Sequence, residues 1–151
     1  MTRNLVILGS TGSIGRQTLD VVDHLPIRIL ALTAGTNVTL MEAQCRKYRP
    51  KLVSMATEAA AADLRIRLSD LEISVLSGEE GLLAAATAPE ADTVITAVVG
   101  MVGLKPTLAA IAAGKRIGLA NKETMVCAGE LVMAAADRSE EHTSELHSLA
   151  Y

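Results

Sequence analysis

The chain has 151 residues, 50% of them hydrophobic and only two of them aromatic, which predicts one domain around an aliphatic core. Its formal net charge is -3 and no basic block occurs, so the sequence gives no support to nucleic-acid binding. No long apolar stretch lacks polar breaks, which indicates no membrane-spanning helix, and two cysteines without metal-type spacing favour a reduced, cytoplasmic protein.

Apolar runs and helical patterns alternate along the chain. Short apolar runs indicate strands, and apolar residues at helical spacing indicate helices. In chain order the pattern predicts a strand over 4–8, a helix over 14–24, a strand over 28–33, a helix over 38–48, a strand over 51–55, a helix over 57–68, a strand over 72–76, a helix over 79–86, a strand over 92–99, a helix over 104–113, a strand over 116–120 and a helix over 124–136. Such alternation is typical of an α/β fold with a Rossmann-like, doubly wound parallel sheet and helices on both faces.

The first strand is followed by a run with the spacing Gly-x-x-Gly-x-x-Gly, residues 9–15, which opens the first helix. Gly9 permits a sharp exit from the strand, Gly12 lets a pyrophosphate approach the backbone, and Gly15 lets the helix pack closely on the strand. Hydroxyl groups on Thr11 and Ser13 add hydrogen-bond donors, and the helix N-terminus favours an anion. We therefore predict a nucleotide-phosphate site; the alternative is a glycine turn that binds no ligand.

The second strand ends in a loop without a carboxylate. NAD-selective folds place an acidic residue there, about twenty residues past the glycines, to bind the ribose hydroxyls. Here the loop is Gly35-Thr36-Asn37, and nothing in it repels a 2′-phosphate. Thr36 and Asn37 can donate hydrogen bonds to that phosphate, so the loop is compatible with NADPH. Asn37 is also predicted to cap the helix over 38–48.

A third polar group follows the last predicted strand. Asn121, Lys122 and Glu123 stand between that strand and the last helix, where ligands bind in open α/β sheets. The structural alternative is helix capping by Asn121, with Glu123 favouring the helix dipole. Capping does not explain Lys122, because a cation is unfavourable at a helix N-terminus, so we predict a binding role for this group.

Several of these segments together resemble one family. Residues 8–15, 18–22, 34–38, 99–100, 103–111 and 120–123 resemble, in order, the N-terminal NADPH-binding domain of 1-deoxy-D-xylulose 5-phosphate reductoisomerase. The resemblance runs without a large gap from about residue 4 to residue 137. It implies an oxidoreductase that uses NADPH to convert 1-deoxy-D-xylulose 5-phosphate to 2-C-methyl-D-erythritol 4-phosphate, in the non-mevalonate pathway of isoprene biosynthesis.

The resemblance also implies roles for individual residues. The phosphate loop of the family matches Thr11, Gly12, Ser13 and Ile14, and its adenosine side matches Gly35, Thr36 and Asn37. Cofactor-binding positions match Asn121 and Glu123, and a position that contacts the sugar-phosphate substrate matches Lys122. Many relatives carry a basic residue at position 36, so Thr36 implies a weaker preference for NADPH over NADH.

The family continues into parts that this sequence does not contain. The resemblance implies a catalytic domain whose carboxylates hold a divalent metal, Mg²⁺ or Mn²⁺, a lid over the substrate, and a homodimer. The sequence shows no carboxylate cluster suited to a divalent cation. No catalytic or metal-binding residue is therefore assigned, and the fragment alone is expected to be inactive.

Residues 138–151 are polar, unlike the aliphatic sequence before them, and closely resemble the translation of a common sequencing adapter. We expect an NADPH-binding domain over 1–137 and a non-native or disordered tail over 138–151. The alternative is an ordinary polar C-terminal tail. In either case Glu141, His142 and Glu145 are not interpreted as a metal site.

Two other functions remain open. A short-chain dehydrogenase needs Tyr-x-x-x-Lys, in which the lysine lowers the pKa of the tyrosine, and here Tyr48 is followed by Lys51, one residue short of that spacing. A non-catalytic nucleotide-binding module would bind the cofactor tightly and would not need Lys122.

Overall fold

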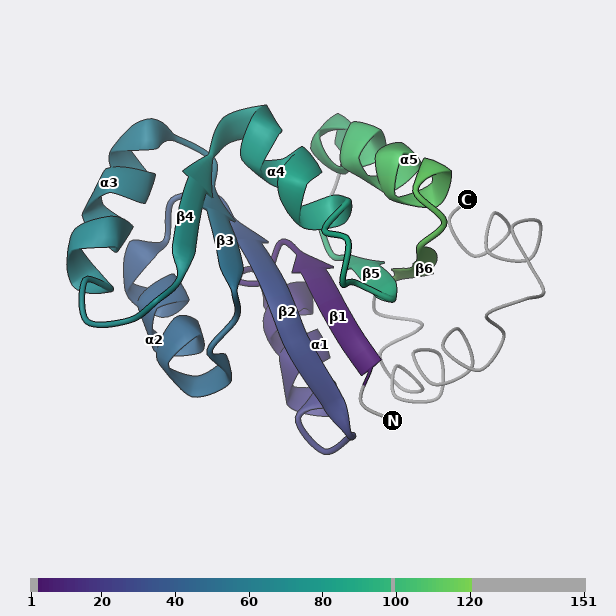
Figure 1. Ribbon diagram of the computed structural model, residues 1–151, viewed down its shortest axis with the longest axis horizontal. Helices are drawn as coiled ribbons and strands as arrows, with labels where there is room; N and C mark the ends of the chain where they lie inside the picture. The colour runs from purple at the N-terminus through teal and green to yellow at the C-terminus, as the bar shows by residue number, and fades with distance from the viewer. Residues whose placement is uncertain (1–2, 99, 121–151) are drawn as a thin grey trace.

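The computed structural model describes residues 3–98 and 100–120, which form one parallel sheet with helices packed against it (Figure 1). These residues contain six strands, namely β1 (Arg3–Leu8), β2 (Ile27–Ala34), β3 (Leu52–Met55), β4 (Ser74–Ser77), β5 (Thr93–Thr96) and β6 (Arg116–Leu119). Their order across the sheet is β4-β3-β2-β1-β5-β6, and every neighbouring pair runs parallel. The predicted doubly wound parallel sheet is confirmed.

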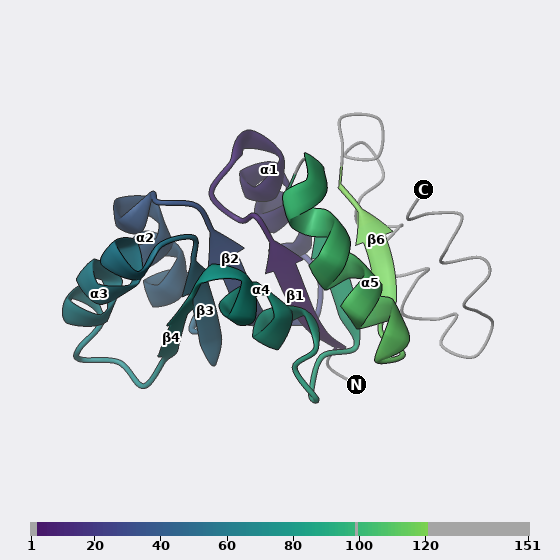
Figure 2. The ribbon, with the colours of Figure 1, turned by 90° about the horizontal axis from the view of Figure 1, so that it is seen from above.

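Helices cover both faces of this sheet. They are α1 (Ser13–Val22), α2 (Val38–Tyr48), α3 (Glu58–Arg67), α4 (Gly78–Ala86) and α5 (Leu104–Ala112), with a 3₁₀ turn, η1 (Gly100–Gly103), before α5. One buried apolar cluster joins α1, α2 and α3 to the sheet through Leu19, Met41 and Leu64. A second cluster joins α4 and α5 to the opposite face through Ala85 and Ala110. Figure 2 shows α4 and α5 side by side over that face.

A bulge in β2 sets the register at the carboxyl end of the sheet. Leu5 of β1 pairs with Ile29, whereas the next residue, Val6, pairs with Ala31, so that Leu30 is an extra residue in β2. The shift brings the last residue of β1 opposite the penultimate residue of β2. The loops that follow β1 and β2 therefore start next to each other.

The cap that the sequence predicts at Asn37 is confirmed. The Oδ1 atom of Asn37 accepts a hydrogen bond from the backbone N–H of Leu40 at 3.1 Å, which is the geometry of an N-terminal cap. Gly114 follows the end of α5 with a φ of +80°, a conformation that favours glycine. The helix expected over 124–136 and the tail over 138–151 lie outside the described residues.

The strand expected over 92–99 is shorter than predicted and ends at Thr96. Thr96 pairs with Leu8, the last residue of β1, so the neighbouring strand offers no partner beyond it. The backbone N–H of Ala97 still donates to the carbonyl of Leu8 at 2.8 Å. Val98 then lies against Gly9, where the chain of β1 turns away from the sheet. The end of β5 is thus set by the turn after β1.

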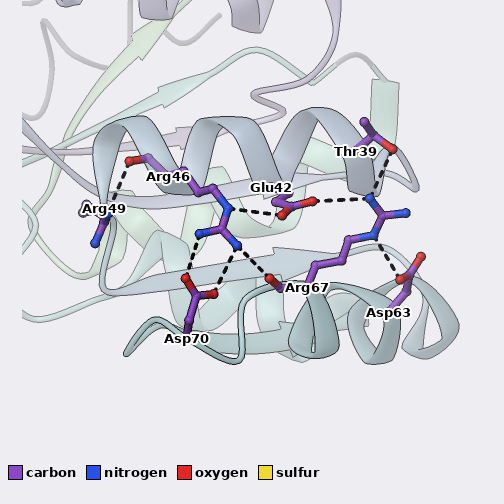
Figure 3. A network of polar contacts seen from close by, with 7 residues as sticks. All are labelled: Thr39, Glu42, Arg46, Arg49, Asp63, Arg67 and Asp70. Carbon is purple, nitrogen blue, oxygen red and sulfur yellow. Dashed lines mark hydrogen bonds and ion pairs between the residues drawn. The ribbon is translucent and has the colours of Figure 1, made fainter.

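A network of exposed ion pairs joins α2 to α3 and to the loop after α3 (Figure 3). The guanidinium of Arg46 pairs with Glu42 at 3.1 Å and with Asp70 at 2.9 Å. The guanidinium of Arg67 pairs with Asp63 at 3.1 Å and with Glu42 at 3.3 Å. The hydrogen bond from Arg46 lowers the pKa of Asp70. These contacts fix α3 against α2, and they neutralise both arginines.

Candidate functional site

The glycine run of residues 9–15 forms a tight turn between β1 and α1. Gly9 has a φ of +86°, a conformation that L side chains rarely adopt. A Cβ at Gly15 would overlap the backbone carbonyl oxygen of Gly9, so only glycine allows α1 to approach the turn this closely. A Cβ at Gly12 would meet no atom within 4 Å. The turn is therefore closed on its inner side and open at Gly12.

Hydrogen bonds from β2 and α2 hold this turn in place. The backbone N–H groups of Gly9 and Ser10 both donate to the carbonyl oxygen of Thr33, at 3.1 and 2.8 Å. The Oγ of Ser10 donates to the Oε1 of Gln44 at 2.7 Å, and the Nε2 of Gln44 donates back to the carbonyl oxygen of Ser10 at 2.9 Å. Ser10 and Gln44 are both buried. The turn is thus fixed before any ligand arrives.

The N-terminus of α1 faces the open side of the turn. Gly12 is the N-cap, and no side chain in the described part of the chain accepts a hydrogen bond from the first turn. The first helical bond runs from the N–H of Arg16 to the carbonyl of Gly12 at 2.9 Å. The N–H groups of Ser13, Ile14 and Gly15 precede that bond and are directed outward by the helix geometry. Together with the helix dipole, they form a site that favours an anion.

The loop after β2 lies beside the turn and is also exposed. Gly35, Thr36 and Asn37 are all exposed, and a Cβ at Gly35 would meet no atom within 4 Å. The carbonyl of Gly35 accepts a hydrogen bond from the N–H of Ala56 at 2.9 Å, which ties the loop to the end of β3. The structure therefore brings together two groups of residues that the sequence places in separate loops, 11–14 and 35–37.

A small apolar hollow opens next to the second loop. Its volume is about 90 Å³, and it is lined by Thr33, Ala34, Gly35, Ser54, Met55, Ala56, Leu82, Val98 and Val102. These residues come from the carboxyl ends of β2 and β3, from α4 and from the segment after β5. Ligands of open α/β sheets bind at this edge, beside the point where the strand order reverses between β1 and β5.

Three predicted site residues, Asn121, Lys122 and Glu123, lie outside the described residues. The chain leads toward them from the same edge of the sheet, because the N–H of Ala120 donates to the carbonyl of Thr96 at 3.0 Å, just beyond the end of β6. Within residues 3–98 and 100–120, no group of three or more His, Cys, Asp or Glu side chains is placed to hold a metal ion. No helix in this part of the chain is long and apolar enough to cross a membrane.

Neither Cys45 nor Tyr48 has the environment of a reactive group. Cys45 is fully buried, and burial raises the pKa of its thiol to about 12. Tyr48 ends α2 at the amino edge of the sheet, away from the glycine turn, and burial also raises its pKa. Lys51 pairs with Glu90 at 2.8 Å. The arrangement does not support a short-chain dehydrogenase, in which a lysine must lower the pKa of the tyrosine.

Gln44 is a positioning residue that the motif analysis missed. It lies among the buried residues of α2, which are Val38, Met41, Gln44 and Cys45. A polar residue on an otherwise apolar helix face was the available signal, because a buried amide needs a hydrogen-bond partner.

A family profile described as 1-deoxy-D-xylulose 5-phosphate reductoisomerase matches residues 5–129. The chain belongs to this family. It is 56% identical over 144 residues to the 1-deoxy-D-xylulose 5-phosphate reductoisomerase of Heliobacterium modesticaldum, an alignment that covers 93% of this chain and 37% of the relative. The chain thus spans little more than a third of the length of that reductoisomerase.

Solved structures of reductoisomerases have the same fold. The enzyme from Zymomonas mobilis in complex with NADPH is 35% identical, with a TM-score of 0.75 over 92% of this chain and 37% of that one. A reductoisomerase in complex with NADPH, fosmidomycin and magnesium is 42% identical, with a TM-score of 0.75 over 91% of this chain and 34% of that one. The similarity therefore covers nearly all of this chain and about a third of the length of each enzyme.

Proposed function

We propose that the chain is the cofactor-binding part of a 1-deoxy-D-xylulose 5-phosphate reductoisomerase, an enzyme that converts 1-deoxy-D-xylulose 5-phosphate to 2-C-methyl-D-erythritol 4-phosphate with NADPH. One observation carries the proposal. A glycine turn at the carboxyl edge of a parallel sheet is locked by Ser10 and Gln44 and presents an uncapped helix N-terminus. Such a turn is suited to the pyrophosphate of a dinucleotide. Membership of the family supports NADPH as that dinucleotide.

The proposal assigns each loop to one part of the cofactor. The pyrophosphate binds the first turn of α1 and the residues before it, namely Thr11, Gly12, Ser13 and Ile14. The adenosine end binds the loop after β2, namely Gly35, Thr36 and Asn37. The apolar hollow beside that loop is available to the adenine ring, because its lining offers apolar atoms from Met55, Leu82 and Val98.

The remaining assignments concern parts outside the described residues. We assign Asn121 and Glu123 to the cofactor and Lys122 to the sugar-phosphate substrate. The NADPH-binding domain is assigned to residues 1–137, with 138–151 as a non-native tail. The divalent metal, Mg²⁺ or Mn²⁺, is assigned to the part of the full-length enzyme that this chain does not cover. The complete enzyme is assigned to the cytoplasm as a homodimer, and the 151-residue chain is expected to bind NADPH without turnover.

Calorimetry with NADPH tests the cofactor site. Gly12→Val fills the open side of the turn, where a Cβ meets no protein atom, so it should abolish NADPH binding while the chain remains folded. Ala112→Val is the matched control, since it adds an exposed valine at the end of α5, at the opposite edge of the sheet. Circular dichroism and thermal unfolding should show that both variants fold. An unchanged affinity for NADPH in Gly12→Val would contradict the proposal.

A further inference from the structure

A groove between α1 and α2 begins at the two cofactor loops. Its volume is about 320 Å³, and it is lined by Arg16, Leu19, Asp20, Leu40, Ala43, Gln44, Lys47 and Tyr48. Both helices start at the carboxyl edge of the sheet, and Arg16 and Leu40 lie close to those starts. The end of the groove lined by Arg16 and Leu40 therefore adjoins the glycine turn and the loop after β2.

Arg16 is a basic residue without a partner at that end of the groove. Its side chain is exposed and makes no hydrogen bond or ion pair within residues 3–98 and 100–120. Three other bases on α2 and α3 are neutralised by carboxylates. Lys47, lower in the groove, pairs with Asp23 at 3.4 Å, and Arg46 and Arg67 each pair with two carboxylates. The guanidinium of Arg16 is thus available to a ligand.

Hydrogen bonds connect the surroundings of Arg16 to both loops. The backbone N–H of Arg16 donates to the carbonyl of Gly12, in the glycine turn. Gln44, which shares the groove with Arg16, holds Ser10 in the same turn. Leu40, on the facing helix, donates its backbone N–H to the side chain of Asn37 at 3.1 Å. The groove that Arg16 lines is therefore bordered by residues bonded to the predicted pyrophosphate loop and to the predicted adenosine loop.

We propose that Arg16 binds the 2′-phosphate of NADPH and supplies the positive charge that Thr36 does not. The inference rests on the proposed function, because it concerns the adenosine end of the same cofactor. A phosphate dianion is bound best by a guanidinium, which offers two parallel N–H donors. Thr36 and Asn37 supply neutral donors only. Asp20, the carboxylate that lines the groove, lies one helical turn further from the loops, and within residues 3–98 and 100–120 no ion pair joins it to Arg16.

The test compares ligands with and without the 2′-phosphate on the 151-residue chain. Dissociation constants for NADPH, NADH, 2′,5′-ADP and 5′-AMP are measured by calorimetry for the wild type, Arg16→Gln and Arg16→Lys. Arg28→Gln is the matched control, because Arg28 is also exposed but lies at the amino end of β2, at the opposite edge of the sheet. Thermal unfolding checks that the exposed substitutions leave the fold intact.

We expect Arg16→Gln to weaken NADPH and 2′,5′-ADP about tenfold or more and to leave NADH and 5′-AMP unchanged. Arg16→Lys should lose less affinity, and Arg28→Gln should lose none. Equal losses for NADPH and NADH would overturn the inference, since Arg16 would then serve a group common to both. Unchanged NADPH binding in Arg16→Gln would overturn it as well, with the proposed function intact. Failure of the wild type to bind either dinucleotide would overturn both.

Discussion

Ser10 and Gln44 exchange two hydrogen bonds across 34 residues of sequence, at 2.7 and 2.9 Å, and both side chains are buried. The exchange joins the glycine turn to α2. Because Gln44 also lines the groove that contains Arg16, one side chain fixes the glycine turn and shapes the neighbouring surface. A dinucleotide site needs such support, since a loop held in one geometry loses less conformational freedom when a ligand binds.

Removing the amide of Gln44 should therefore destabilise the fold and weaken NADPH binding together. In Gln44→Leu the hydroxyl and the carbonyl of Ser10 lose their buried partner, which costs about 1–3 kcal/mol in the free energy of unfolding. Urea unfolding measures this loss. Gln17→Leu is the matched control, because Gln17 is exposed and its loss should change the stability little.

A double-mutant cycle with Ser10→Ala then separates this pair from general packing. The two substitutions should be non-additive by roughly 0.5–3 kcal/mol, as expected for residues in direct contact. If Gln44→Leu unfolds at the same urea concentration as the wild type and binds NADPH equally well, the pair does not support the turn.

Gly15 and Gly12 should respond in opposite ways to the same substitution. Gly15→Ala forces a Cβ into the backbone oxygen of Gly9, so we expect a loss of about 2 kcal/mol or more in unfolding free energy, or failure to fold. Gly12→Ala places its Cβ in open space at a φ of -76°, so its stability should stay within about 0.5 kcal/mol of the wild type. If the two variants have the same free energy of unfolding in urea, α1 does not lie as close to the turn as the structure shows.

The sequence was sufficient for features that depend on nearby residues. The glycine spacing predicted the turn after β1, and Asn37 predicted the cap of α2, since a cap is set within one helical turn. Long-range partners were not predictable. The pattern of strands does not say that β5 returns to pair with β1, or that β5 ends at Thr96 because its neighbour ends at Leu8. Ser10 and Gln44 likewise needed the fold to bring them together.

Thr36→Lys should tighten the binding of NADPH selectively. The substitution adds a cation to an exposed loop that has no charge of its own, and NADH lacks the phosphate that the cation would bind. Combined with Arg16→Gln, it should restore most of the NADPH affinity that the arginine variant loses, because the two cations serve the same phosphate. Thr36→Glu is the charge-reversed control and should weaken NADPH more than NADH. If neither substitution changes the ratio of the dissociation constants for NADPH and NADH, the loop does not contact the 2′-phosphate of the ribose.

Because of Cys45, the free energy of unfolding should fall as the pH rises above 9. Burial raises the pKa of its thiol from 9.0 to about 12, so the folded state retains a proton that the unfolded chain releases above pH 9. Below pH 9 both states hold the proton and the thiol adds no pH dependence. Between pH 9 and pH 12 the unfolded state is favoured progressively, by about 1.4 kcal/mol at pH 10.

Urea unfolding at pH 8 and pH 10 measures this effect in the wild type and in Cys45→Ala. The alanine variant should be less stable at pH 8, because the buried sulfur is replaced by a small cavity, but it should lose less stability on going to pH 10. Other groups that titrate in this range are the same in both proteins, so they cancel in the comparison. Parallel losses of stability in the two proteins would show that the thiol of Cys45 titrates alike in the folded and unfolded states, and would contradict the prediction.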